Sequence, residues 1–302
     1  MTYPSIRETV YHGQKPTLIA CVSPHGADAK DFLAAFPEIQ EDPQLVSIWP
    51  LFESYLAIER DTGAHELAHA IAHFINRRYD VPCLVAEVTY PRAIVDGGRL
   101  IDHCLRHCLP TALFVRLKKD FLALHRHTLD YMEALYQRLA GFDAAYLIDV
   151  HTMASFCPAD DQGRRTIQPV SFQLLEDYVD QFMNARNHLY QRRIDLITAD
   201  ARGQILADPA LTAAIAASLA AAGYPLASNE PYHAAPAFLS YQHLQRARAL
   251  SFDVPKHLVA RWKGDWSDYQ LDEVPLDSEK IASLAAAVGL GVGQVLVAQG
   301  LV

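Results

Sequence analysis

Short apolar runs alternate with longer segments of helical periodicity along most of this chain. The runs 17–23, 81–90 and 144–153 are dominated by apolar residues and predict buried strands. Segments 61–75 and 111–139 carry apolar residues at helical spacing and predict helices between these strands. The alternation predicts right-handed strand–helix–strand units and an α/β fold, in which a mostly parallel mixed sheet is flanked by helices on both faces.

The second half of the chain continues this alternation with shorter elements. The expected elements are strands at 195–198, 225–228 and 249–254, and helices at 172–192 and 209–222. Beyond residue 266 the chain becomes acidic, and 278–299 then predicts two short helices rich in Ala, Val and Gly. We therefore expect one α/β domain over residues 1–265 and a C-terminal helical appendage over residues 266–302.

Composition narrows the classes of partner. The chain has 302 residues and a formal net charge of -9, which argues against nucleic acid and anionic membranes as partners. No apolar run reaches the roughly 20 residues that span a bilayer, and the N-terminus lacks the apolar core of a signal peptide. We therefore expect a cytoplasmic protein whose five cysteines are reduced thiols. The sequence predicts no oligomeric state.

Polar side chains follow or end several of the predicted strands. Asp149 and His151 are two apart, so they point to the same face of their strand. His25 comes directly after the first strand and is followed by Gly26, as expected for a ligand held on a tight turn. Because ligands of open α/β sheets bind at the carboxyl ends of the strands, these residues are candidates for a site. The alternatives are a strand-end histidine capped by an aspartate and, for Asp253 in a late strand, an edge-strand carboxylate instead of a base facing a pocket.

A second candidate lies on the predicted helix 61–75. His65, Glu66 and His69 form the pattern H-E-x-x-H, in which two histidines on one helix face bind zinc and the glutamate acts as base. This zincin hypothesis makes the protein a zincin-type metalloprotease. Ile75 occupies the position of the third histidine of metzincins, so that extension is missing. The competing hypothesis is an amphipathic helix whose histidines lie outside the core.

The loop after the strand 81–90 concentrates cationic side chains. Arg92 and Arg99 bracket Asp96 and a Gly-Gly pair, which indicates a loop shaped around an anion. The alternative is a surface Arg–Asp ion pair, which contributes little to stability.

Six short motifs, taken in order, resemble those of the N-formylglutamate amidohydrolase family, relatives of zinc carboxypeptidases and aspartoacylases. They are Pro24-His25-Gly26, Asp61-Thr62-Gly63-Ala64, Tyr90-Pro91-Arg92 with Asp96-Gly97-Gly98-Arg99, Asp149-Val150-His151-Thr152-Met153, Asn229-Glu230-Pro231-Tyr232 and Ser251-Phe252-Asp253. The resemblance implies a zinc-carboxypeptidase-like hydrolase fold. It also implies metal-dependent hydrolysis of the linear amide bond of a small-molecule N-acyl amino acid, such as N-formylglutamate.

The resemblance further implies a ligand set for the metal. His25, Asp61 and His151 would hold one zinc ion, or another divalent metal, and would leave a position open for water. Asp28 is a rival to Asp61 as the carboxylate ligand. Asp149 could orient a ligand without binding the metal.

The same resemblance assigns the substrate-facing residues. Asp253 would be the base that takes a proton from water and hands it to the leaving amine. Arg92 and Arg99 would bind a substrate carboxylate or stabilise the oxyanion. Asn229 and Tyr232 would contact the substrate.

Four features depart from the family pattern. Gly98 replaces an asparagine, residues 233–235 replace glycines, Asp253 replaces a glutamate and Pro255 replaces an arginine. These changes leave open an altered specificity, or a non-catalytic binding protein on the same scaffold.

Overall fold

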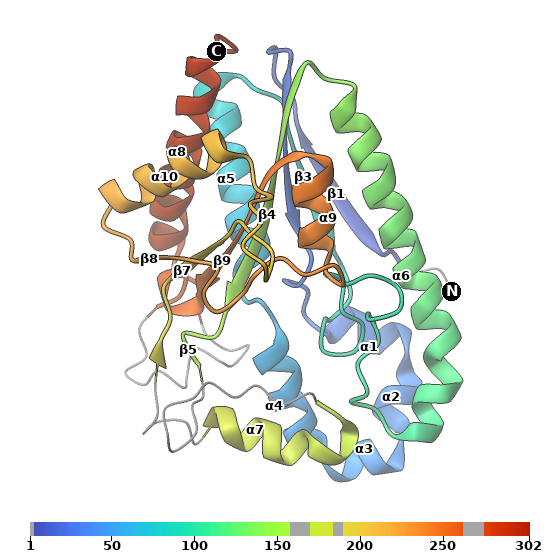
Figure 1. Cartoon of the computed structure of the whole chain (residues 1–302). Helices are drawn as coiled ribbons and strands as arrows, with labels where there is room; N and C mark the ends of the chain where they lie inside the picture. The colour runs from blue at the N-terminus through green and yellow to red at the C-terminus, as the bar shows by residue number, and fades with distance from the viewer. Residues whose placement is uncertain (1–2, 158–169, 184–189, 262–274) are drawn as a thin grey trace.

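A seven-stranded sheet forms the centre of the molecule, as the computed structural model in Figure 1 shows. The structure describes residues 3–157, 170–183, 190–261 and 275–302. The strand order is β1-β3-β2-β4-β9-β7-β8. The strands are β1 (Ile6–Tyr11), β2 (Thr17–Ser23), β3 (Cys83–Val88), β4 (Ala144–Met153), β7 (Ile194–Ile197), β8 (Leu226–Ser228) and β9 (Arg248–Pro255). A separate small sheet pairs β5 (Phe156–Cys157) with β6 (Tyr190–Gln191).

The sheet is mixed but parallel at its centre, which confirms the expected fold class. Strands β3, β2, β4 and β9 are parallel neighbours. Strand β1 is antiparallel to β3, and β7 is antiparallel to β9. Every residue of β2 and β3 is buried, as expected for apolar strands covered on both faces.

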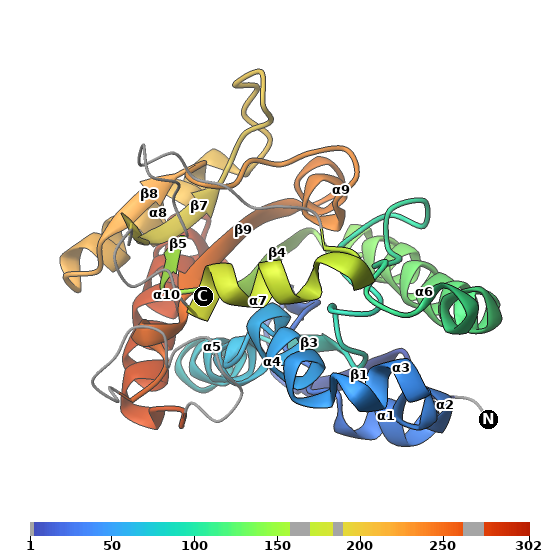
Figure 2. The same ribbon diagram turned by 90° about the horizontal axis from the view of Figure 1, so that it is seen from below.

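Helices cover both faces of the sheet (Figure 2). One face carries α5 (Ala64–Tyr79), α8 (Pro209–Ala221) and α10 (Ser278–Ala298), and the other carries α6 (Thr111–Ala140) and α9 (Leu239–Arg246). A third group gathers beyond the carboxyl ends of the central strands (Figure 1). It contains α1 (Lys30–Ala35), α2 (Pro37–Glu41), α3 (Pro43–Ser47), α4 (Trp49–Glu59) and α7 (Leu175–Met183).

The apolar residues form two cores. The larger joins the central strands to α5, α8 and α10. The smaller is rich in aromatic side chains from α1, α4, α6 and the segment after β3, including Phe32, Phe52, Tyr90 and Phe121. Polar residues at the carboxyl ends of the central strands therefore lie between two apolar cores.

Three expected elements differ from the structure. The helix expected at 172–192 ends within the described residues at Met183, and residues 190–191 form a strand instead. The two short helices expected at 278–299 are the single helix α10. Its glycines serve close packing instead of breaking the helix, since a Cβ on Gly289 would lie 2.4 Å from the ring of Phe74.

Helix α10 also corrects the expectation about membrane-spanning segments. It is long and apolar enough to cross a membrane by length and composition, and it is the one such helix in the described part of the chain. Yet 61% of its most apolar window is buried in this fold, where it packs against α5 and α8. The division at residue 265 stays a prediction, although the buried residues of α10 belong to the larger core.

Candidate metal centre

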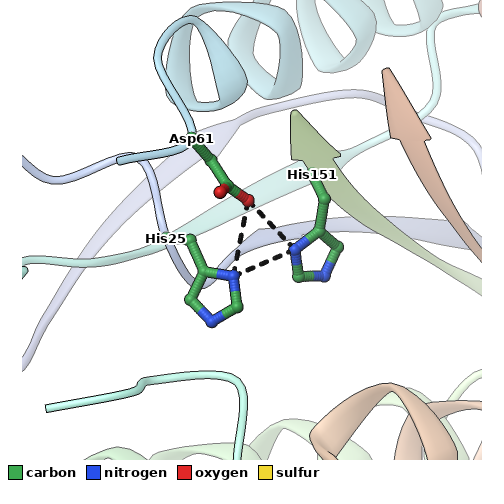
Figure 3. Close-up of side chains that lie close together, drawn as sticks. All are labelled: His25, Asp61 and His151. Atoms are coloured by element: carbon green, nitrogen blue, oxygen red, sulfur yellow. Dashed lines mark hydrogen bonds and ion pairs between the residues drawn. The ribbon is translucent and has the colours of Figure 1, made fainter. Parts of the chain in front are cut away.

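Three side chains from separate segments converge at the carboxyl edge of the sheet (Figure 3). His25 follows β2, Asp61 follows α4, and His151 lies near the end of β4. His151 Nδ1 lies 3.2 Å from His25 Nδ1 and 3.3 Å from Asp61 Oδ2. His25 Nδ1 lies 3.4 Å from Asp61 Oδ2. The three side chains are only 7%, 4% and 12% exposed, and we call them the central group.

This geometry fits a metal ion. Bonds of about 2.0–2.1 Å in a tetrahedral arrangement place neighbouring ligand atoms roughly 3.3 Å apart. Two imidazoles and one carboxylate are a common ligand set of catalytic zinc and leave one position for water. Among the described residues, this is the one group of three such donors whose atoms all lie within 4.8 Å of one another.

A second layer of carboxylates orients both imidazoles. His25 Nε2 lies 2.7 Å from Asp96 Oδ1, and His151 Nε2 lies 3.0 Å from Asp149 Oδ1. A carboxylate oxygen thus lies at the outer nitrogen of each imidazole, and Nδ1 of each ring faces the centre. Burial alone would raise the pKa of Asp149, but His151 and the hydroxyl of Ser251 lower it to about 2. The carboxylate that orients His151 is therefore ionised at neutral pH.

Asp61 is held by its surroundings on two sides. Its N–H donates to the carbonyl of His25 at 3.1 Å, and its Oδ1 accepts from Arg92 Nη1 at 3.0 Å. Gly63, not Asp61, caps α5, and its φ of 89° lies in the left-handed region that glycine tolerates. The turn thereby leaves the Asp61 carboxylate facing the two histidines.

Arginines surround the central group and are paired with carboxylates of the chain. Arg92 Nε lies 3.3 Å from Glu59 Oε2. Asp96 Oδ2 accepts from Arg99 Nε at 2.9 Å and from Arg106 Nη2 at 2.7 Å. The predicted Arg92 and Arg99 are thus both present at the site, and each already holds a carboxylate. Their side chains remain about one quarter exposed, at 26% and 27%.

Gly98 explains one departure from the family pattern. A Cβ at this position would lie 2.5 Å from His25 Nε2, too close for any side chain. The main-chain N–H of Gly98 also donates to Asp96 Oδ1 at 3.1 Å. Glycine is therefore required where the loop closes over His25.

Asp253 lies beside His151 in the sheet, because the two residues are direct partners in the β4–β9 pairing. Its side chain is buried, and Oδ1 has no hydrogen-bond partner among the described residues. Burial and the charge of Asp61 raise the pKa of Asp253 to about 7, against the opposing effect of His151. A carboxylate with this pKa can both accept and release a proton near neutral pH.

Two predicted substrate contacts have different surroundings. Asn229 has a φ of 55°, and its Oδ1 accepts from the N–H groups of Thr198 and Ala199, both at 2.9 Å. Its amide is therefore engaged within the chain, so the geometry gives it a structural role. The hydroxyl of Tyr232 accepts from Arg192 Nη1 at 3.3 Å.

The rival candidates lie outside the central group. Asp28 is exposed, and its carboxylate accepts from the N–H of Lys30 at 2.9 Å, at the start of α1. His65 Nδ1 and His69 Nε2 lie 3.2 and 3.4 Å from Glu87 Oε1, and these three residues form what we call the helical group. Glu66, the base of the zincin hypothesis, is exposed.

Three charged residues at the site were not predicted: Glu59, Arg106 and Arg192. Glu59 lies at the end of a helix and Arg106 in a loop, and neither has a local pattern that marks it. Arg192 precedes the short strand β7. The sequence analysis placed it at the end of an expected helix, 172–192, and therefore not at a strand end near the site. Glu59 and Arg192 are buried and Arg106 is partly buried, and their positions at the site follow from the packing of distant segments.

Known proteins share this fold. No protein-family model and no curated protein sequence matches the chain. An N-formylglutamate amidohydrolase from Ralstonia eutropha JMP134 superposes with a TM-score of 0.55 at 15% identity, over 97% of this chain and 98% of that one. The gene product Atu2144 from Agrobacterium tumefaciens superposes with a TM-score of 0.53 at 12% identity, over 99% and 97%. The chain shares its fold with both structures. The resemblance of the motifs is thus matched by a likeness of fold over nearly the whole length.

Proposed function

We propose that this protein is a zinc-dependent amidohydrolase that cleaves the N-acyl amide of an acidic amino acid such as N-formylglutamate. The proposal rests on the convergence of His25, Asp61 and His151. A carboxylate contacts the outer nitrogen of each of the two imidazoles. The likeness of fold to an N-formylglutamate amidohydrolase supports the choice of substrate. The partner is thus a small N-acyl amino acid, and a cytoplasmic location agrees with such a substrate.

The residues around the central group suit hydrolysis of an amide. When bound, the metal would polarise the amide carbonyl and lower the pKa of the attacking water. Asp253 would accept a proton from that water as its oxygen bonds to the carbonyl carbon. It would then pass the proton to the amide nitrogen as the C–N bond breaks, releasing the acid and the free amino acid. Its pKa of about 7 fits both transfers.

The arginines would serve the anionic parts of the reaction. Arg92 fixes Asp61 through Nη1 and lies close enough to Asp253 to lower its pKa, opposite to the effect of burial. Its remaining donors could stabilise the oxyanion that forms at the carbonyl. Arg99 fixes Asp96 and could bind a carboxylate of the substrate at its exposed edge.

The test is direct. Protein purified without added metal should contain about one zinc ion per chain by elemental analysis, and it should release formate from N-formyl-L-glutamate. Removing the metal with a chelator should abolish release, and adding zinc should restore it. Bound zinc without hydrolysis of any N-acyl amino acid in a panel would favour a binding protein. Absence of any divalent metal would reject the proposal.

A further inference from the structure

We propose that Glu59 is a positioning residue that keeps Arg92 from taking both carboxylate oxygens of Asp61. Tyr178 holds Glu59 in this role. Asp61 Oδ2 thereby stays available to a metal ion in the central group. This inference rests on the proposed function, because it concerns the same metal centre.

Arg92 is divided between two carboxylates that lie close together in the chain. Its Nε lies 3.3 Å from Glu59 Oε2, and its Nη1 donates to Asp61 Oδ1 at 3.0 Å. Glu59 is the last residue of α4, and Asp61 lies in the turn between α4 and α5. The two carboxylates therefore anchor the guanidinium at two different nitrogens.

The anchor at Glu59 limits how Arg92 can meet Asp61. A guanidinium and a carboxylate readily form two parallel N–H···O bonds, which would engage both oxygens of Asp61. Here Oδ2 instead lies 3.3 Å from His151 Nδ1 and 3.4 Å from His25 Nδ1 (Figure 3). Because Glu59 fixes the guanidinium at Nε, the group cannot turn to place a second nitrogen opposite Oδ2. That oxygen is therefore left for the metal.

Glu59 is itself held on both of its oxygens. The hydroxyl of Tyr178, a buried residue of α7, donates to Glu59 Oε1, whereas Arg92 contacts Oε2. Arg106 Nη2 also lies 3.8 Å from Oε2. Burial alone would raise the pKa of Glu59, but the two arginines and the tyrosine hydroxyl lower it. Glu59 is therefore an ionised, buried carboxylate that cannot rotate freely.

Helices α4 and α7 also hold the main chain beside Arg92. The rings of Tyr55 in α4 and Tyr178 in α7 meet edge to face, with their centres 5.7 Å apart. The hydroxyl of Tyr55 donates to the carbonyl of Ala93 at 2.8 Å. The two helices thus fix Arg92 at its main chain and, through Glu59, at its guanidinium.

The first test removes one hydroxyl and no charge. Tyr178→Phe frees Glu59 Oε1, so Arg92 can turn and compete with the metal for its carboxylate ligand. Zinc affinity, measured by competition with a chromophoric chelator, should fall roughly 2- to 10-fold, the range of one hydrogen bond. Tyr146→Phe is the matched control and should leave zinc affinity unchanged. It removes the hydroxyl of a buried tyrosine near the amino end of β4, which donates to Gln299 Oε1 at 2.7 Å.

A double-mutant cycle decides whether the effect passes through Arg92. Lysine offers a single point charge, so Arg92→Lys cannot be divided between two carboxylates in the same way. In this background Tyr178→Phe should change zinc affinity by less than about 2-fold. An unchanged affinity in Tyr178→Phe alone, or the same loss in both backgrounds, would overturn the proposal.

Glu59→Gln tests the carboxylate itself. It removes the charge that anchors Arg92, so zinc affinity should fall further, by roughly 10- to 100-fold. An affinity equal to that of the wild type would overturn the proposal. Thermal unfolding shows whether this variant folds, and if it does not, Tyr178→Phe and its cycle decide alone.

Zinc affinity also separates this proposal from the proposed function, because the measurement requires no hydrolysis. If the wild type binds zinc but cleaves no N-acyl amino acid, the same cycle still applies. If the wild type binds no zinc, the proposed function fails, and unfolding of the metal-free variants decides the present proposal. Tyr178→Phe should then lower the free energy of unfolding more in the wild type than in Arg92→Lys. Equal losses would overturn the link between Tyr178 and Arg92.

Discussion

The central group and the helical group each bring two imidazoles to one carboxylate, but they do so in different ways. The donors of the central group come from three separate segments, and all lie within 4.8 Å of one another. In the helical group both histidines come from α5, and Glu87 Oε1 lies between them at 3.2 and 3.4 Å. Its three donor atoms do not all meet the same 4.8 Å limit.

The surroundings of the two groups differ as well. Carboxylates hold the outer nitrogens of both imidazoles in the central group. In the helical group the hydroxyl of Tyr11 contacts His69 Nδ1 at 2.8 Å, and His65 Nε2 has no hydrogen-bond partner among the described residues. The i,i+4 spacing puts two histidines on one helix face, but it does not orient their nitrogens. In the central group, orientation comes from the carboxylates behind the imidazoles, Asp149 two residues from His151 and Asp96 in another loop.

The largest expected difference is in metal binding. His151→Ala removes a proposed ligand from the central group and should abolish stoichiometric zinc binding, as measured by elemental analysis of the purified variant. His69→Ala is the matched control in the helical group and should retain the metal. The reverse pattern would assign the metal to the helical group and support the zincin hypothesis.

The next expected effect is on turnover. Asp253→Asn keeps the size of the side chain but cannot accept the proton, so turnover should fall at least ~100-fold while zinc remains bound. Asp253→Glu should be tolerated, since it restores a carboxylate. Glu87→Gln and Glu230→Gln should leave turnover nearly unchanged, and a large loss in either would move the role of base to that residue.

A smaller effect is expected from the layer behind the ligands. Asp149→Asn should weaken zinc affinity by roughly 10- to 100-fold, because the outer N–H of His151 loses its carboxylate partner. Competition with a chromophoric chelator measures this change. Glu87→Gln removes the carboxylate of the helical group and should not alter the affinity. A loss of similar size in both variants would contradict the distinction between the groups.

Particular residues show what the sequence could and could not predict. Strand β4 has the expected bounds 144–153. They could be predicted because a single apolar run, followed by polar residues, makes up the strand. His25, Asp61 and His151 were predicted through short motifs adjacent to predicted elements, and the structure brings the three side chains together. Arg192 was missed because β7 has only four residues, and its antiparallel direction is set by pairing with β9 and not by local pattern.

The other omissions have the same origin. Glu59 contacts Arg92 across 33 positions of the chain, and Arg106 contacts the Asp96 carboxylate from a loop with no regular pattern. Asn229 matches a motif, and its side chain accepts from the main chain of Thr198 and Ala199; its contact with a substrate stays a prediction. The motifs predicted which residues lie near the site. They did not predict which partners each side chain contacts, because those contacts depend on how distant segments pack.

The smallest effect concerns the pH dependence of metal affinity. Burial alone would lower the pKa of His151, but Asp149 and Asp61 raise it well above its usual value. In the metal-free protein His151 is therefore protonated at neutral pH, and a metal must displace that proton, since the ligand is neutral imidazole. Zinc affinity should therefore rise with pH between pH 6 and 8, by at most about 10-fold for each pH unit.

The sign of the accompanying stability change is opposite. Because the folded-state pKa of His151 is raised, its contribution to the stability of the metal-free protein is full below the unfolded-state pKa of about 6.5 and is lost as pH rises through the folded-state pKa. Zinc titration with a competing chelator and thermal unfolding of the metal-free protein measure the two trends.

Asp149→Asn should end the rise in affinity at a lower pH, because it removes the charge that holds the proton on His151. Burial lowers the pKa of His65, against the opposing effect of Glu87, so a metal at the helical group would displace less proton from that residue than one beside His151 would displace from His151. A zinc affinity that does not change between pH 6 and 8 would therefore argue that the metal lies somewhere other than beside His151.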